Sequence, residues 1–190
     1  MRMLVHVCCG PCAVYPIARL SAAGYDLTGF FHNPNIHPYQ EFRRRLEAAL
    51  ALSRESGWLL VVDEHYGLRA YLQRVVFDED KRCLHCYDMR LEQVARQAKA
   101  GGYAAFTTTL LYSKYQNHEL IRERAFWWAA QYGMDFYYED FRAGWQEGID
   151  ASIRLGLYRQ PYCGCIYSEQ ERYDKAWRKQ NRKQAEKLSA

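Results

Sequence analysis

The sequence predicts a single α/β domain, with an open, mostly parallel sheet between two layers of helices. Three observations support this class. Short β-rich runs alternate with longer helical runs five times. Most helical runs end at a glycine, the residue preferred just past a helix. At 190 residues, without repeats or low-complexity tracts, the chain is long enough to bury one core.

The individual elements follow from the spacing of apolar residues. Five short runs rich in β-branched and aromatic residues are expected as strands: Met3–Val7, Leu27–Phe31, Leu59–Val62, Ala105–Thr109 and Phe136–Tyr138. Five intervening segments repeat apolar residues at helical spacing: Ala13–Ala23, Gln40–Ser56, Leu68–Val76, Cys86–Ala100 and His118–Tyr132. Glycine follows four of these helices: Gly24, Gly57, Gly101 with Gly102, and Gly133.

This architecture predicts where the functional site lies. In open α/β sheets, ligands bind beyond the carboxyl ends of the strands. Three unusual segments leave those ends: Cys8–Cys12 after the first strand, Asn33–Pro38 after the second, and Leu110–Asn117 after the fourth. We therefore expect a site at that edge of the sheet.

Composition and charge restrict the class of protein. No apolar run approaches the roughly 20 residues of a membrane helix, and the N-terminal apolar run is too short for a secretory signal. We therefore expect a cytoplasmic protein without membrane contact. The segment 167–190 carries seven basic and four acidic residues. It is expected to form a basic C-terminal helix, which suits either a phosphate backbone or a solvated surface.

The seven cysteines form three groups. They are Cys8, Cys9 and Cys12, then Cys83 and Cys86, then Cys163 and Cys165. Clustered cysteines in a cytosolic protein indicate metal binding or catalysis more often than disulfides. Seven thiols are too many for one structural zinc and one too few for two all-cysteine sites. A four-cysteine iron–sulfur cluster leaves three thiols for a second metal or for redox chemistry.

Several other residues are candidates for chemistry. His6 is either a partner of the cysteine site or a buried core histidine. Asp140 follows the last strand, where it supplies an acid or caps a turn. Tyr162 directly precedes Cys163, so it is placed to stack on a base or to donate a proton. These three residues are our candidate proton donors.

A second group of residues is expected to bind substrate, because each lies at or near the predicted edge. Arg159 and Gln160 precede the last cysteine pair, and Arg159 suits a phosphate. The hydroxyl of Thr109 ends the fourth strand. The remaining members come from the two loop segments: Asn33, Asn35, Lys114 and Asn117.

Six strings carry a resemblance to a known family. They are LVHVCCGPCA, NPNIHP, KRCLHCYDMRL, FTTTLLYSKYQN, EDFR and LYRQPYCGCIYS. In this order, from about Leu4 to Ser168, they resemble the QueH family of epoxyqueuosine reductases. The resemblance implies a fold similar to the nucleotide-binding α/β proteins that include PP-loop enzymes. It also implies reduction of the epoxide of epoxyqueuosine, at the wobble position of tRNA, to queuosine without cobalamin.

The resemblance further implies the cofactors and partners. The family is associated with a [4Fe–4S] cluster beside a mononuclear iron. We assign Cys9, Cys83, Cys86 and Cys163 to the cluster, and Cys8, Cys12 and Cys165 to the second metal. Arg159, Lys114, Asn117 and the basic helix would hold the anticodon stem-loop. No G-x-G-x-x-G motif follows a strand, so an external electron donor is expected.

Two departures from the family and three alternatives remain. The family often carries a glycine-containing acidic stretch before Arg-Cys, where this chain has Asp78–Lys81. The family usually has Ala-Pro where this chain has Gly10-Pro11, a change expected only to loosen the turn. A zinc-stabilised RNA-binding module would need the cysteines but no redox activity. A thiol–disulfide oxidoreductase would need only Cys9 and Cys12. A PP-loop-type tRNA thiolase would need an S-G-G-x-D-S string, which the sequence lacks.

Overall fold

A computed structural model describes residues 1–188 of the chain, and its side chains through residue 181. Five strands form one sheet in the order β3-β2-β1-β4-β5, and every neighbouring pair is parallel. The strands are β1 (Arg2–His6), β2 (Asp26–Phe31), β3 (Leu59–Val62), β4 (Ala105–Thr108) and β5 (Asp135–Phe136). The predicted α/β class with an open parallel sheet is confirmed.

Helices connect and cover these strands. Five match the expected ones: α1 (Gly10–Ala22), α2 (Tyr39–Ser56), α3 (Leu68–Val75), α4 (Arg82–Ala100) and α5 (His118–Tyr132). Three follow the sheet: α6 (Trp145–Arg154), α7 (Ile166–Tyr173) and α8 (Lys175–Leu188). Three short 3-10 turns complete the order: η1 (Glu79–Lys81), η2 (Thr109–Tyr112) and η3 (Phe141–Gly144). Among the described helices, none is long and apolar enough to cross a membrane.

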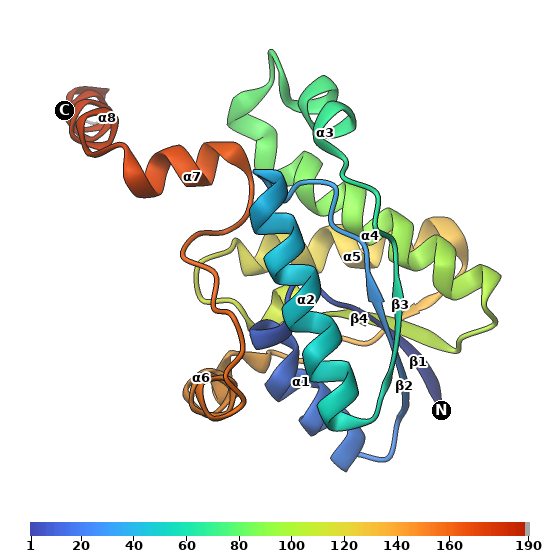
Figure 1. Ribbon diagram of the computed structural model, residues 1–190. Coiled ribbons are helices and arrows are strands. Elements are labelled where there is room, and N and C mark those ends of the chain that lie inside the picture. The colour runs from blue at the N-terminus through green and yellow to red at the C-terminus, as the bar shows by residue number, and fades with distance from the viewer. Residues whose placement is uncertain (189–190) are drawn as a thin grey trace.

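The helices form two layers around the sheet, as Figure 1 shows. Helices α1 and α2 lie against one face, and α4 and α5 lie against the other. Strand β1 occupies the centre, and its last four residues are buried. The connections run to β2 on one side of β1 and to β4 on the other. This reversal of strand order lies between β1 and β4, the position at which open α/β sheets bind ligands beyond the strand ends.

Gly10 lets the first two helices pack closely, so our expectation that it only loosens the turn was wrong. A Cβ atom at this position would lie 2.5 Å from the backbone oxygen of Ala48 in α2. Backbone cannot retreat as a flexible side chain can. Gly10 therefore permits the close approach of α1 and α2 in this chain.

The C-terminal segment forms two helices, which corrects the single helix expected over 167–190. Asp174 leaves the helical conformation, and its carboxylate accepts a hydrogen bond from the backbone N–H of Trp177 at 2.9 Å. Aspartate at such a position ends one helix and starts the next. Figure 1 shows α7 and α8 extending away from the sheet, on the side opposite the N-terminus. Ser189 and Ala190 lie outside the described residues.

Candidate metal centre and adjoining cavity

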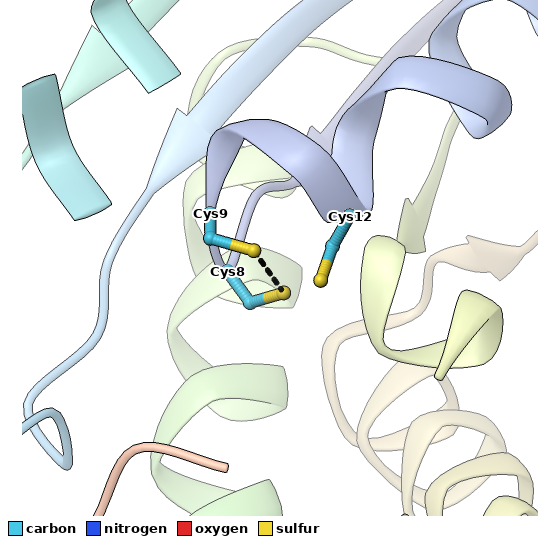
Figure 2. Close-up of side chains that lie close together, drawn as sticks. All are labelled: Cys8, Cys9 and Cys12. Carbon is cyan, nitrogen blue, oxygen red and sulfur yellow. Dashed lines mark hydrogen bonds between the residues drawn. The ribbon is translucent and has the colours of Figure 1, made fainter. Parts of the chain in front are cut away.

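Three thiols meet where β1 ends and α1 begins. The Sγ atoms of Cys8, Cys9 and Cys12 all lie within 4.8 Å of one another, and all three residues are buried (Figure 2). Cys9 is the N-cap of α1, and Pro11 lies in its first turn. This turn brings Cys12 back beside Cys8. The group could hold a metal ion, which is consistent with the expected metal site.

The pKa values of the three thiols shift in opposite directions. Hydrogen bonds from Cys12 and Cys9 lower the pKa of Cys8 well below its ordinary value. Burial raises the pKa of Cys9, and the hydrogen bond to Cys8 raises that of Cys12. Since a metal binds thiolates, binding here would release the protons of those cysteines that carry them.

The other four cysteines are Cys83, Cys86, Cys163 and Cys165, and among the described residues no three of them bring their sulfur atoms within 4.8 Å of one another. Burial is the main cause of the raised pKa of Cys83, Cys86 and Cys163, which reaches about 11 for Cys163. The charge of Cys165 raises the pKa of each of these three further. All seven cysteines are free. The charge of Cys165 thus acts on each of the other three, and none of the four is in a disulfide.

Hydrogen-bond donors surround the sulfur atoms. Arg90 Nη2 and Asn35 Nδ2 donate to Cys86 Sγ, at 2.7 and 3.2 Å. The Thr109 hydroxyl donates to Cys8 Sγ at 3.3 Å, and Gln160 Nε2 donates to Cys12 Sγ at 3.1 Å. Arg90 is 2% exposed, so its charge is placed to offset nearby thiolates. Donors aimed at sulfur are what thiolate ligands of a metal require.

A buried ion pair holds the last cysteine segment in place. Arg45 Nη1 and Nη2 donate to the backbone oxygens of Cys163 and Tyr162, at 2.7 and 2.8 Å. Glu41 Oε1 accepts from Arg45 Nε at 2.7 Å, and Glu41 Oε2 accepts from the hydroxyl of Tyr158 at 2.5 Å. The α2 helix thereby fixes a segment that lies more than a hundred residues further along the chain.

A cavity of about 640 Å³ opens beside the thiols. Cys8, Cys12 and Cys163 contribute to its wall. Aromatic side chains line it at Tyr112, Tyr115, Trp145 and Tyr162, and cationic ones at Arg45, Arg159, Arg172 and Arg178. A pocket of this size, with aromatic rings and positive charge, suits a nucleotide.

The three candidate proton donors have different surroundings. Both ring nitrogens of His6 are engaged, by Thr108 Oγ1 at 2.9 Å and the His32 carbonyl at 3.2 Å, and burial lowers its pKa to about 3. The structure thus favours the core-histidine alternative. Asp140 caps η3 and pairs with Arg142, and it is not among the cavity residues. Only Tyr162 lines the cavity, although its hydroxyl donates to the His37 carbonyl.

The expected substrate residues divide into two sets. Arg159 and Gln160 line the cavity. The Lys114 ammonium lies 4.3 Å from the ring centre of Trp145, which also lines the cavity. The other four make structural contacts instead. Asn33 donates to the Val7 carbonyl, Asn35 and Thr109 donate to cysteine sulfurs, and Asn117 caps α5. Short polar side chains at strand and helix ends commonly satisfy nearby backbone in this way.

Two arginines of the site escaped the sequence analysis. Arg90 lies four residues after Cys86, one helical turn away on the same face. That spacing was a usable signal. Arg45 lies four residues after Glu41. Oppositely charged residues at this spacing usually form an ion pair on the exposed face of a helix. Only the packing shows that both side chains are buried.

Comparisons with known proteins agree with the resemblance in the sequence. A family model described as "Epoxyqueuosine reductase QueH" matches residues 3–171. An epoxyqueuosine reductase QueH from Dehalococcoides mccartyi is 38% identical over 174 residues, covering 92% of this chain and 96% of that protein. One from Thermotoga maritima is 35% identical over 182 residues, covering 91% and 93%.

A solved structure supports the fold alone. It is described as a predicted subunit of a tRNA methyltransferase from Methanocaldococcus jannaschii. Its TM-score is 0.53 at 13% identity, and the match covers 80% of this chain and 76% of the other. At that identity the likeness concerns the arrangement of strands and helices.

Proposed function

The chain belongs to the QueH family of epoxyqueuosine reductases, and from this premise we propose that its cysteine site and cavity reduce epoxyqueuosine in tRNA to queuosine. The reaction converts an epoxide to an alkene. It consumes two electrons and two protons, and it releases the oxygen as water. The observation that carries the proposal is the convergence of thiols on the wall of a nucleotide-sized cavity.

This proposal assigns the thiols differently from the sequence analysis. Cys9 lies with Cys8 and Cys12, whereas the charge of Cys165 acts on Cys83, Cys86 and Cys163. The proposed [4Fe–4S] cluster therefore takes Cys83, Cys86, Cys163 and Cys165. The proposed second iron takes thiolates from the first group. Held there, the cluster would supply single electrons and the iron would supply Lewis acidity toward an epoxide oxygen.

The protein's own residues prepare this site for reaction. Arg90, Asn35, Gln160 and Thr109 donate hydrogen bonds to the sulfurs, which orients the thiolates and offsets their charge. Arg45 holds the segment that carries Cys163. Tyr162 is the proposed proton donor because it alone of the three candidates lines the cavity.

The proposed partners follow from the substrate. The anticodon stem-loop of tRNA would enter the cavity with its modified base splayed from the stack. Arg159, Arg172 and Arg178 line the cavity and would hold its phosphates. An external donor provides the electrons, and the proposed location is the cytoplasm.

The deciding experiment is metal and sulfide analysis of protein purified without oxygen. We expect a brown protein that contains more iron than sulfide. Cys86→Ser should lose both sulfide and colour, whereas Cys12→Ser should keep the sulfide and lose iron. His85→Ala is the matched control, because His85 lies between two proposed ligands but bonds to Asp78. A protein that holds only zinc after anaerobic reconstitution would instead support the structural RNA-binding module.

A further inference from the structure

Two buried oxygen atoms in the cavity wall have no hydrogen-bond donor among the described residues. They are the side-chain Oε1 atoms of Gln116 and Gln160, and both residues line the cavity. The two glutamines come from different parts of the chain, the loop before α5 and the segment before Cys163. A buried acceptor without a donor costs free energy, and most such groups in native proteins have a partner. Two in one cavity point to a ligand that supplies donors.

The orientation of the Gln160 amide is determined by its neighbour. Its Nε2 atom donates to Cys12 Sγ at 3.1 Å. Turning the amide over would place its oxygen against the sulfur and lose this hydrogen bond. Oε1 of Gln160 is therefore an acceptor without a donor among the described residues. Water can occupy that position, and a ligand that displaces it must bring a donor of its own.

The substrate of the proposed function carries suitable donors at both ends. Its guanine-type base has a ring N–H and an exocyclic amino group along one edge. The substituent that bears the epoxide carries an amine and hydroxyl groups. We infer that Gln160 accepts a hydrogen bond from this substituent, and that Gln116 accepts one from the edge of the base. This inference rests on the proposed function.

The positions of the two residues support this division. Gln160 touches Cys12, so it lies beside the thiols where the epoxide must react. Gln116 follows Tyr115, which lines the same cavity and is 84% exposed. The ring of Tyr115 packs edge-on near Trp145, with centroids 6.5 Å apart. Gln116 thus belongs to the aromatic outer part of the cavity, which suits a base better than a small reacting group.

The test compares binding of three anticodon stem-loops to the metal-loaded protein. The loops carry epoxyqueuosine, guanosine or inosine at the wobble position, and inosine lacks the exocyclic amino group of guanosine. Gln160→Met should reduce the preference for epoxyqueuosine over guanosine about tenfold, with guanosine-loop affinity unchanged. Gln116→Met should reduce the preference for guanosine over inosine by a similar factor. Gln131→Met, on the exposed part of α5, is the matched control and should change neither.

The outcomes separate this inference from the proposed function. Iron and sulfide content is measured for every variant, and Gln160→Leu repeats the test if the methionine variant loses iron. If the wild type prefers the epoxyqueuosine loop and reduces it, while both variants keep their preferences within about twofold, the inference is overturned and the function stands. If the wild type neither prefers nor reduces that loop, both are overturned.

Discussion

Thr107 and Thr109 lie in the same chain segment, but their hydroxyl groups differ in the hydrogen bonds that they make. Thr109 Oγ1 accepts the Cys8 backbone N–H at 3.1 Å and donates to Cys8 Sγ. Thr107 is also fully buried, but its hydroxyl has no hydrogen-bond partner in the part of the chain that the structure describes. The sequence TTT indicates only a preference for strand. The value of each hydroxyl depends on what lies across from it.

This contrast predicts opposite effects of the same substitution. Thr109→Val leaves the Cys8 N–H buried without an acceptor, so it should reduce the free energy of unfolding by about 1–3 kcal/mol. Thr107→Val removes a hydroxyl that is already unpaired, so it should be neutral or stabilising. Urea denaturation of both variants measures the difference. Equal destabilisation would show that the Thr109 hydrogen bonds contribute nothing specific.

At the scale of single elements, the ion pair on α2 connects stability to the site. Arg45 and Glu41 have side chains only 3% and 5% exposed. Breaking a buried pair leaves an uncompensated charge, which costs about 3–5 kcal/mol. Arg45→Met should therefore destabilise the protein by this amount in urea denaturation. It should also increase proteolysis near residues 158–165, because the carbonyls of Tyr162 and Cys163 lose their donor.

Arg54→Met is the control for that substitution. Arg54 lies near the end of the same helix and is exposed, so its loss should change stability little. If Arg45→Met is as stable as Arg54→Met, the buried pair does not hold the cysteine segment. Both variants replace arginine by methionine on the same helix, so any effect of helix propensity is common to both. The difference between them measures the loss of the buried charge.

Helix α1 makes a second prediction at this scale. Gly10→Ala introduces a Cβ atom 2.5 Å from the Ala48 backbone oxygen, so α1 and α2 must separate. Overpacking of this kind costs about 1–3 kcal/mol, and the movement should lower iron binding because Gly10 lies between Cys9 and Cys12. A Cβ atom at Gly24 would have no other atom within 4 Å, so Gly24→Ala introduces only backbone strain, at φ +82°. This control should destabilise without affecting iron content.

On the scale of the whole molecule, the proposed binding of RNA phosphates depends on the cationic side chains that line the cavity. Arg172 and Arg178, on α7 and α8, line the cavity. If each binds a phosphate, replacing both with glutamine should weaken binding of every stem-loop equally. The slope of log affinity against log salt should fall by about 0.7 for each phosphate that is no longer neutralised. If the double variant keeps the slope of the wild type, as the exposed control Arg54→Gln should, then Arg172 and Arg178 do not bind the phosphates.

The order of elements was predictable because periodicity is a local property. The five expected strands and helices exist, with ends displaced by a few residues, most at the start of α4, where Arg82 rather than Cys86 is first. Helix α6 and the division between α7 and α8 were missed. Asp174 uses its side chain to start a new helix, and a basic, polar segment gives little apolar pattern in which to detect such a break.

The sequence by itself determined the alternation of strands and helices, the three groups of cysteines, and their expected place beyond the strand ends. These follow from local patterning and from the rule for parallel sheets. Only the tertiary structure decided which thiols lie together, that Arg45 and Arg90 are buried beside them, and that Asn117 and Asp140 cap helices instead of lining the cavity. The physical reason is that burial and contact between residues tens of positions apart depend on how helices pack across the sheet, which no local pattern records.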